Sequence, residues 1–149
     1  MKKKSLLIIA IAFAGLLQAQ EQLTASQQAV QHTVIKMFNA LSNRDSVSLK
    51  DYCTTDILLF ENGMVWNVDT LILKGITLNQ TTDFKRINTI DFINTTINKN
   101  TAWATYHLQS EITRKGKHGF VQWMETVVLV RDKKRWKIKV LHSTLIKRG

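Results

Sequence analysis

The chain has 149 residues, one cysteine, no proline and 44% hydrophobic residues, with 21 Lys and Arg against 11 Asp and Glu. This composition is typical of one globular domain, and it disfavours two full domains, a disordered chain, a collagen-like repeat and a coiled coil. A single cysteine also excludes an intramolecular disulfide and a cysteine-rich zinc site.

The first 20 residues have the order of a secretory signal peptide. Three lysines at positions 2–4 precede an apolar run over residues 6–17, and the polar stretch Gln18-Ala19-Gln20 follows it. As a helix this run reaches about 18 Å, which is short of the ~30 Å hydrocarbon core of a bilayer. We therefore predict cleavage near Ala19, a single domain over residues 20–149, and an exported protein, periplasmic or secreted, with no stable membrane span in its mature form. An uncleaved membrane anchor is the alternative.

The excess of basic residues lies near the C-terminus. Residues 110–149 contain eleven basic and three acidic residues, whereas residues 20–109 contain seven and eight. The basic residues gather at 114–117 and 131–135, which both read as hairpin turns, so charge solvated at turns is the simpler interpretation. An anionic surface such as lipid headgroups or polysaccharide is the alternative. We predict no nucleic-acid partner for the exported protein.

The N-terminal part of the mature chain has helical periodicity. Thr24 and Gln27 can form a capping box, and apolar residues then recur at helical spacing, which predicts one long amphipathic helix over residues 25–42. Asp45 or Ser46 can cap a short second helix. We expect Cys53 on the apolar face of that helix, as a buried and unreactive thiol.

Strand patterns then dominate. Residues 57–60 and 64–66 flank Asn62-Gly63, a strong signal for a two-residue hairpin, and Asn67 can cap another short helix that ends near Gly75. Four long strands are predicted at 85–97, 101–114, 120–131 and 136–146, joined by short turns and therefore antiparallel. The fold class is α+β: a long N-terminal helix and short helices packed on a strongly curved antiparallel sheet.

This order of elements resembles the NTF2-like superfamily, specifically its SnoaL-like and DUF4440-type members. The segments Trp136–Ser143 and Glu125–Asp132 carry the resemblance, and the second is also similar to the last hairpin of the calcium/calmodulin-dependent kinase II association domain. The resemblance covers about residues 23–145 and implies a cone-shaped fold. It does not imply one function, because the superfamily includes isomerases, dehydratases, cyclases and assembly domains.

Strand alternation locates the interior of the cone. On the second long strand Tyr106 and Leu108 belong to the apolar set, and on the last strand His142 shares a face with Trp136. For the third strand the resemblance favours Trp123, Glu125 and Val127 as inward. The predicted pocket is therefore Phe60, Trp66, Tyr106, Leu108, Trp123, Glu125, Val127 and His142.

Three functions remain open for this pocket. A non-catalytic binding module for a small, mostly apolar ligand is the leading hypothesis, because the pocket composition favours it. An isomerase-like or dehydratase-like enzyme would use Glu125 and His142 as an acid/base pair. The simpler interpretation is that His142 bonds to the backbone and Glu125 pairs with a nearby Lys or Arg. No cofactor is predicted, and no metal, because the four histidines lack a recognisable ligand spacing.

An assembly domain without ligand is the third hypothesis. Trp103 is expected on the outer face of the sheet, and burying a large aromatic side chain removes ~150–250 Å² from water. We therefore predict a homodimer through the outer face. The residues expected to contact the second copy are Trp103, Val128, Val130, Leu141 and Leu145.

Overall fold

The structure is a computed structural model that describes residues 22–149. The predicted signal peptide and its cleavage near Ala19 lie outside the described residues, so export stays a prediction. Within residues 22–149, no helix is both long enough and apolar enough to cross a membrane.

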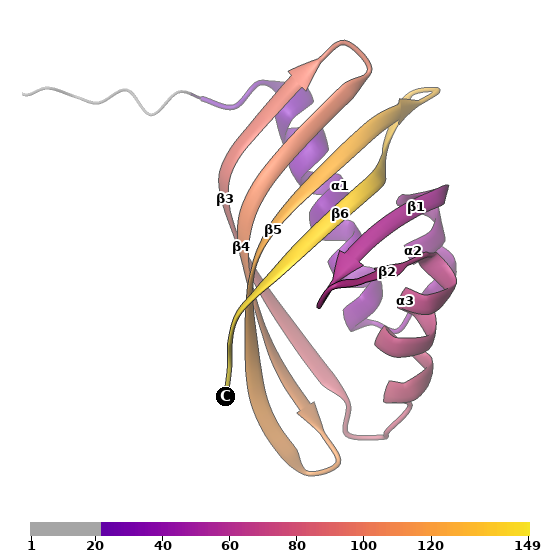
Figure 1. Cartoon of the computed structure of the whole chain (residues 1–149), viewed down its shortest axis with the longest axis vertical. Coiled ribbons are helices and arrows are strands. Elements are labelled where there is room, and N and C mark those ends of the chain that lie inside the picture. Colours follow the sequence, from indigo (N-terminus) through magenta and orange to yellow (C-terminus); the bar gives the residue numbers. More distant parts are fainter. Residues whose placement is uncertain (1–21) are drawn as a thin grey trace, which may run out of the picture.

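Helices come first in the chain and strands last, which confirms the α+β fold class. The helical elements are α1 (Ala25–Ser42), α2 (Ser46–Asp51), α3 (Val68–Gly75) and the short 3-10 helix η1 (Thr77–Asn79). The strands are β1 (Cys53–Glu61), β2 (Met64–Trp66), β3 (Lys85–Asn98), β4 (Thr101–Arg114), β5 (Lys117–Asp132) and β6 (Arg135–Arg148). They form one sheet in the order β2-β1-β6-β5-β4-β3, and α1 lies across one of its faces (Figure 1).

One strand pair departs from the predicted antiparallel sheet. β1 pairs with β6 in parallel, so the sheet is mixed, while all its other neighbours are antiparallel. β1 comes from the helical half of the chain and pairs with the edge of β6 that β5 leaves free. β1 thereby adds a wall to the cone beside α3 (Figure 1).

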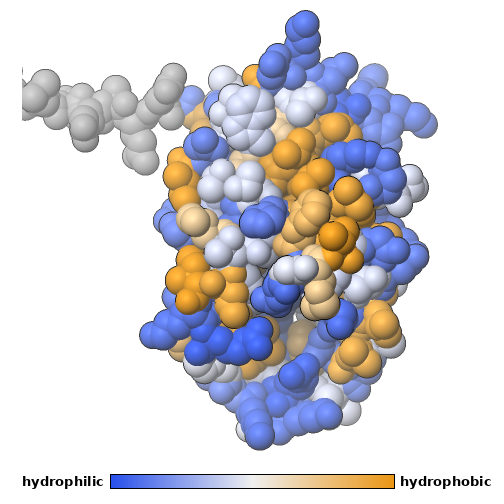
Figure 2. Space-filling model, viewed as in Figure 1, coloured by the Kyte–Doolittle hydropathy of each residue, from blue (hydrophilic) through white to orange (hydrophobic). Residues whose placement is uncertain are grey.

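The face of the sheet away from α1 carries an apolar row that crosses four strands. Leu58 pairs with Val140, Val140 with Val128, and Val128 with Trp103. Leu58 is 45% exposed and Trp103 is 37% exposed. Figure 2, viewed from the side on which the strands cover α1, shows hydrophobic side chains gathered across the middle of the molecule, with hydrophilic ones toward both ends.

Two residues predicted for this outer face lie on the inner side. Leu141 is only 4% exposed and belongs to the core, and Leu145 pairs with Trp123, which faces inward. Both follow a bulge in β6, described below, that the sequence pattern did not indicate. Val130 pairs with Lys137 and stays on the outer side, as predicted.

Local hydrogen bonds fix the helices where the sequence predicts them. Thr24 accepts from the Gln27 amide at 3.2 Å and Gln27 Oε1 accepts from the Thr24 amide at 2.8 Å, which is the predicted capping box of α1. The buried side of α1 faces the sheet through Val30, Val34, Met37, Phe38, Ala40 and Leu41. Its N-terminal turns are tied to β3, because Gln27 and Gln31 both donate to Thr95.

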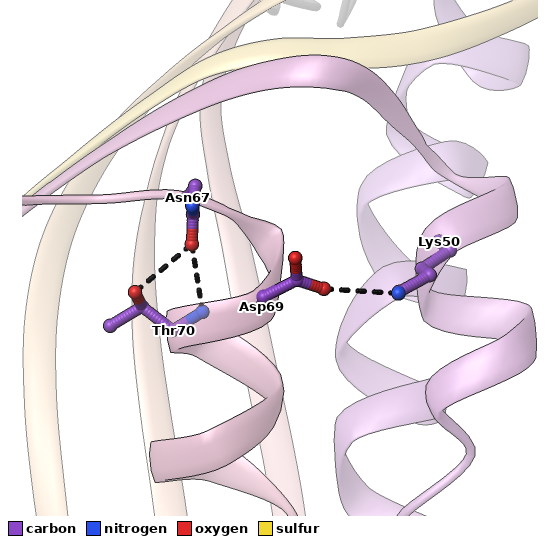
Figure 3. Close-up of polar contacts among 4 residues, drawn as sticks. All are labelled: Lys50, Asn67, Asp69 and Thr70. Atoms are coloured by element: carbon purple, nitrogen blue, oxygen red, sulfur yellow. Dashed lines mark hydrogen bonds and ion pairs between the residues drawn. The ribbon is translucent and has the colours of Figure 1, made fainter.

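The cap of α3 holds one wall of the later site. Asn67 Oδ1 accepts from the backbone amide of Thr70 at 2.9 Å and from its hydroxyl at 3.0 Å, as Figure 3 shows. In the same view Lys50 of α2 forms a 3.0 Å ion pair with Asp69. Both groups of this pair are exposed, so it contributes little to stability.

Cys53 is the first residue of β1, not a member of α2 as expected. It pairs with Ile138 of β6 and is 2% exposed. Burial raises the pKa of its thiol to about 12, so the thiolate is scarce at neutral pH. The predicted buried thiol is present, but on a strand.

A bulge in β6 reverses the side-chain alternation of the last strand. Leu129 pairs with Ile138 and Val128 with Val140, so Lys139 is an extra residue opposite β5. Its side chain forms an ion pair with Asp56 at the irregular part of β1. Residues after the bulge therefore point to the opposite side from the predicted one, which turns His142 outward.

Candidate functional site

A cavity of about 810 Å³ lies at one end of the cone. It is bounded by the C-terminal half of α1, by α3, and by the ends of the long strands that extend past α1 (Figure 1). The apolar side chains in its wall are Met37, Phe38, Leu41, Leu59, Trp66, Leu71, Phe84, Leu108, Ile112, Phe120, Val121, Trp123 and Leu141. The wall is therefore mainly apolar, and polar groups enter it at a few defined points.

Half of the predicted pocket residues line this cavity: Trp66, Leu108, Trp123 and Glu125. Tyr106 and Val127 are fully buried in the packed part of the cone and do not line it.

Phe60 and His142 lie on the outer face, contrary to prediction. They are register partners on β1 and β6, with ring centroids 6.1 Å apart. Phe60 turns outward because Ile57 and Leu59 alternate inward on β1, and His142 turns outward because of the bulge at Lys139. Glu125 and His142 are therefore on opposite faces of the sheet, and the predicted acid/base pair does not form.

Glu125 is the buried acid of the cavity. It is 4% exposed, and its Oε1 accepts from the Ser143 hydroxyl at 2.7 Å. Its Oε2 and the Tyr106 hydroxyl are both buried without a hydrogen-bond partner among residues 22–149. Burial raises the pKa of Glu125 to about 7, against the hydroxyls of Ser143 and Tyr106 and the charge of Arg86, which lower it, while the charge of Glu61 raises it further. The carboxyl is therefore poised between its two protonation states at neutral pH.

Arg86 of β3 is a partly buried cation in the same cavity. Its Nε donates to Asn88 at 2.9 Å and its Nη2 donates to Ser110 at 3.0 Å. The guanidinium carbon lies 5.8 Å from the ring centroid of Phe38 and 6.0 Å from that of Trp123. Burial lowers the pKa of Arg86 to about 10, and it stays charged at neutral pH. None of the ion pairs within residues 22–149 includes it.

A polar network fixes the position of Arg86. The Ser110 hydroxyl donates to Asn88 Oδ1 at 2.7 Å, and Asn88 Nδ2 donates to the Ser42 hydroxyl at 2.7 Å and to the Phe38 carbonyl at 3.2 Å. Because both groups that hold the guanidinium are themselves held, Arg86 is preorganised at the cavity wall.

Arg86 and Glu61 are functional candidates that sequence reasoning missed. A signal for Arg86 exists in β3, where Arg86, Asn88, Ile90 and Phe92 alternate toward the inner side, opposite Ile112, Ser110, Leu108 and Tyr106. Continuing the alternation from Phe92 and Ile90 toward the start of β3 would have placed the Arg86 side chain on the inner face of the sheet. Glu61, the last residue of β1, follows the same alternation from Leu59 and lines the cavity.

Basic residues surround the mouth of the cavity: Lys74, Arg114, Lys115, Lys117, His118 and Arg148. The tip between β4 and β5 is held there, because Asp83 accepts from the amides of Lys115 at 3.0 Å and Gly116 at 2.6 Å. Arg114 donates to Asn79 of η1. One of the two basic clusters found in the sequence is thus part of the cavity entrance.

The described residues 22–149 contain no group of three or more His, Cys, Asp or Glu side chains arranged to hold a metal ion. The acids Glu61 and Glu125 and the cation Arg86 line the mainly apolar wall, and further basic residues lie at the mouth.

Solved structures with the same fold come from several organisms. The chain is similar to a conserved protein from Planctomyces limnophilus, with 15% identity and a TM-score of 0.74 over 82% of this chain and 98% of that one. An NTF2-like protein from Cytophaga hutchinsonii aligns with 16% identity and a TM-score of 0.70, over 83% and 100% of the two chains. A ketosteroid isomerase-like protein from Erwinia carotovora atroseptica aligns with 13% identity and a TM-score of 0.68, over 84% and 99%.

These identities establish a shared fold and no more. No curated protein matches the chain. The family model of the SnoaL-like domain matches residues 30–146, which span α1 to β6 and include every residue of the cavity wall except those at the extreme C-terminus. The chain belongs to the SnoaL-like domain family and has the NTF2-like fold.

Proposed function

We propose that this domain is a non-catalytic binding module that holds a small, mostly apolar molecule in its cavity. The observation that carries the proposal is the cavity itself: its volume of about 810 Å³ lies within the ~300–1,000 Å³ typical of small-molecule sites. A cone filled with side chains would instead favour a purely structural role in assembly. In this domain side chains pack the cone as far as Tyr106 and Val127, and the cavity lies beyond these two residues.

Binding of a neutral apolar dye, N-phenyl-1-naphthylamine, tests this proposal. Leu71 of α3 lines the cavity, whereas Leu73 on the same helix is 49% exposed and does not. We expect Leu71→Trp to fill part of the cavity and weaken dye binding at least about tenfold, and Leu73→Trp to leave it unchanged. Native mass spectrometry of protein from its own host would report a bound molecule directly. Failure of the wild type to bind either the dye or a native molecule would contradict the proposal.

A proton-transfer enzyme is the second candidate, and Glu125 favours it. A carboxyl with a pKa of about 7 and an unpartnered oxygen in a cavity suits a general base, and Arg86 could stabilise an enolate. The similarity to a ketosteroid isomerase-like protein is compatible with this candidate. Isomerisation of cyclohex-3-enone to the conjugated ketone, followed by ultraviolet absorbance, tests it. We expect Glu125→Gln to reduce the rate about 100-fold or more; a wild type no faster than buffer would rule this candidate out.

We also propose that two copies associate through the outer sheet face. The row Leu58, Val140, Val128 and Trp103 is continuous across four strands and contains no charged residue, so a second copy of the same row could cover it. This interface differs from the one predicted from the sequence, because it leaves out Leu141 and Leu145, which lie on the inner side of the sheet.

Export remains a proposal that rests on residues 1–20 of the sequence. The exported form should begin at or near Gln20, and an intact-mass measurement on protein recovered outside the cytoplasm tests this. Recovery of the full 149 residues in the membrane fraction would favour the anchor instead.

A further inference from the structure

We propose that the ligand of the cavity is an amphipathic carboxylate whose anionic group binds the free edge of Arg86, and that Glu125 takes up a proton when this ligand binds. The inference rests on the proposed binding function and names its ligand class. It follows from the hydrogen bonds that Arg86 and Glu125 make and from those that they leave unmade.

The guanidinium of Arg86 retains an anion-binding edge. Of its five N–H groups, one on Nε bonds to Asn88 and one on Nη2 bonds to Ser110. The two on Nη1 and the second on Nη2 have no acceptor among residues 22–149. Adjacent N–H groups on Nη1 and Nη2 match the spacing of two carboxylate oxygens. The charges of Glu125 and Glu61 raise the pKa of Arg86, but neither carboxylate forms an ion pair with it, so a bound carboxylate would supply a direct partner for the guanidinium.

Trp123 offers a further donor in this part of the wall. Its ring lines the cavity close to Arg86, and its Nε1 is buried without a hydrogen-bond partner in the described part of the chain. The apolar wall formed by α1, α3 and β1 would accommodate the hydrocarbon part of the ligand.

Glu125 must be neutral for this arrangement to be stable. A ligand carboxylate in the same cavity as an ionised Glu125 would place two negative charges in an apolar environment. If Glu125 accepts a proton from the buffer at Oε2, the repulsion disappears and the new O–H can donate a hydrogen bond. Ser143 donates to Oε1, which leaves Oε2, on the side of its register partner Tyr106, as the oxygen that takes up the proton.

The charged and titratable groups around Glu125 come from several elements. Tyr106 of β4 stays neutral, because burial and then the charge of Glu125 raise the pKa of its hydroxyl well above its ordinary value. β1 contributes Glu61, β3 contributes Arg86 and α3 contributes Lys74, whereas α1 presents only apolar side chains to the cavity. β4 and the turn after it add Arg114 and Lys115, and β5 and β6 add Lys117, His118 and Arg148.

Proton uptake gives the binding a defined pH dependence. The pKa of the free Glu125 is about 7, so the carboxyl is mostly protonated at pH 6 and mostly ionised at pH 8. Binding of an anion should therefore take up almost no proton at pH 6 and close to one at pH 8. At pH 8, one unit above the pKa, only about a tenth of the protein carries the protonated Glu125 that binds the anion. The affinity for the anion should therefore be roughly tenfold weaker at pH 8 than at pH 6.

Calorimetric titration with octanoate and octan-1-ol tests the proposal on the full mature chain. Octanoate is ionised at both pH values, and the alcohol has the same chain without the charge. Titration at pH 8 in phosphate and in Tris, which differ in ionisation enthalpy, counts the protons taken up. We expect octanoate to bind at least about tenfold more tightly than octan-1-ol at pH 6, with close to one proton taken up at pH 8.

Two variants separate the roles. Arg86→Met should remove the preference for octanoate, a loss of at least about tenfold, while octan-1-ol still binds and so reports an intact cavity. Lys85→Met is its matched control, because Lys85 is the exposed neighbour on β3. Glu125→Gln should abolish proton uptake and restore the pH 6 affinity at pH 8. Its control is Glu111→Gln, at an exposed position of β4.

Each outcome is decisive. Equal binding of octanoate and octan-1-ol by the wild type would overturn the role of Arg86 and leave an apolar binding module. Tighter octanoate binding without proton uptake would overturn the role of Glu125. Binding of neither compound, nor of the neutral dye, would overturn the proposed function itself.

Discussion

The two ends of the cone are built from the same strands but are filled differently. At one end Ala102 and Ala104 of β4 present small side chains to α1, and Leu129 and Ile138 close the layer beside them. These residues are all fully buried. At the other end the C-terminal half of α1, α3 and the same sheet enclose a cavity. The filled end therefore supplies packing, and the hollow end supplies space.

The polar groups follow this division. Arg86, Asn88, Ser110, Glu125 and Ser143 occupy inner positions on the cavity half of the sheet, whereas the inner positions of the filled half are apolar except for Thr95, which is hydrogen-bonded to Gln27 and Gln31. Buried polar groups are unfavourable for folding unless they are paired, and Arg86 and Glu125 each keep an unpaired group. The packing that stabilises the fold is therefore concentrated at the filled end, and the groups that can bind a ligand are concentrated at the cavity end.

Truncating one leucine at each end should give the largest difference in stability. Leu129 is fully buried in the filled end, and Leu108 lies at the cavity wall at 1% exposure. Leu→Ala in a packed core costs about 2–5 kcal/mol, partly for the new cavity. We expect Leu129→Ala near the top of this range and Leu108→Ala near the bottom, because its space is already hollow. Urea unfolding measures both, and equal losses would contradict the division into two ends.

The buried acid should make stability depend on pH. The folded pKa of Glu125 is about 7 and its ordinary value is 4.5, so between these values the folded state holds a proton that the unfolded state has lost. Stability from this group is therefore highest below pH 4.5, falls by about 3 kcal/mol as the pH rises to 7, and then levels off.

Glu125→Gln should remove this component of the pH dependence. The difference between wild-type and variant unfolding free energies, measured in urea from pH 4.5 to pH 8, isolates Glu125 because other titrating groups contribute to both proteins. A difference that stays constant over this range would mean that the carboxyl is not held in its neutral form.

Local signals made most of the fold predictable from the sequence. The Thr24 capping box, the Asn67 cap and the Asn62-Gly63 turn, whose φ angles of 50° and 75° suit a two-residue hairpin, each depend on a few adjacent residues. The alternation of β4 was also correct, because that strand runs without a bulge against β5. Such features need no knowledge of distant partners.

The site was less predictable because its residues depend on register. His142 was assigned inward by counting from Trp136, and the extra residue Lys139 reversed that count. The only sign of this bulge in the sequence is that the apolar residues Ile138 and Leu141 are three positions apart, whereas inward residues of a regular strand are two apart. Arg86 was missed for a different reason: a charged residue at the end of an otherwise apolar alternation suggests solvent, and only the Asn88 network and the surrounding aromatic rings hold it inside.

Disrupting the outer face should affect association more than folding. Trp103→Asp introduces a charge into the apolar row, so we expect a dimer to become a monomer in light scattering at tens of micromolar. Because Trp103 is 37% exposed, the stability of the single copy should change little. His107→Asp, at an exposed outer position four residues along β4, is the control and should leave the mass unchanged. A monomeric wild type would count against the interface, and a dimer that survives Trp103→Asp would move it elsewhere.

The smallest perturbation uses Cys53 as a reporter of the filled end. Its thiol is buried opposite Ile138 and its pKa is raised to about 12, so labelling by a thiol reagent in the native protein requires opening of this end. We expect slow labelling in the wild type, much faster labelling in Leu129→Ala, and only a modest increase in Leu108→Ala. Under conditions where reclosing outpaces labelling, the rate ratio gives the change in opening free energy, about tenfold for each 1.4 kcal/mol. Equal acceleration by both variants would mean that the two ends open as one unit, so that the hollow end is as much a part of the cooperative core as the filled one.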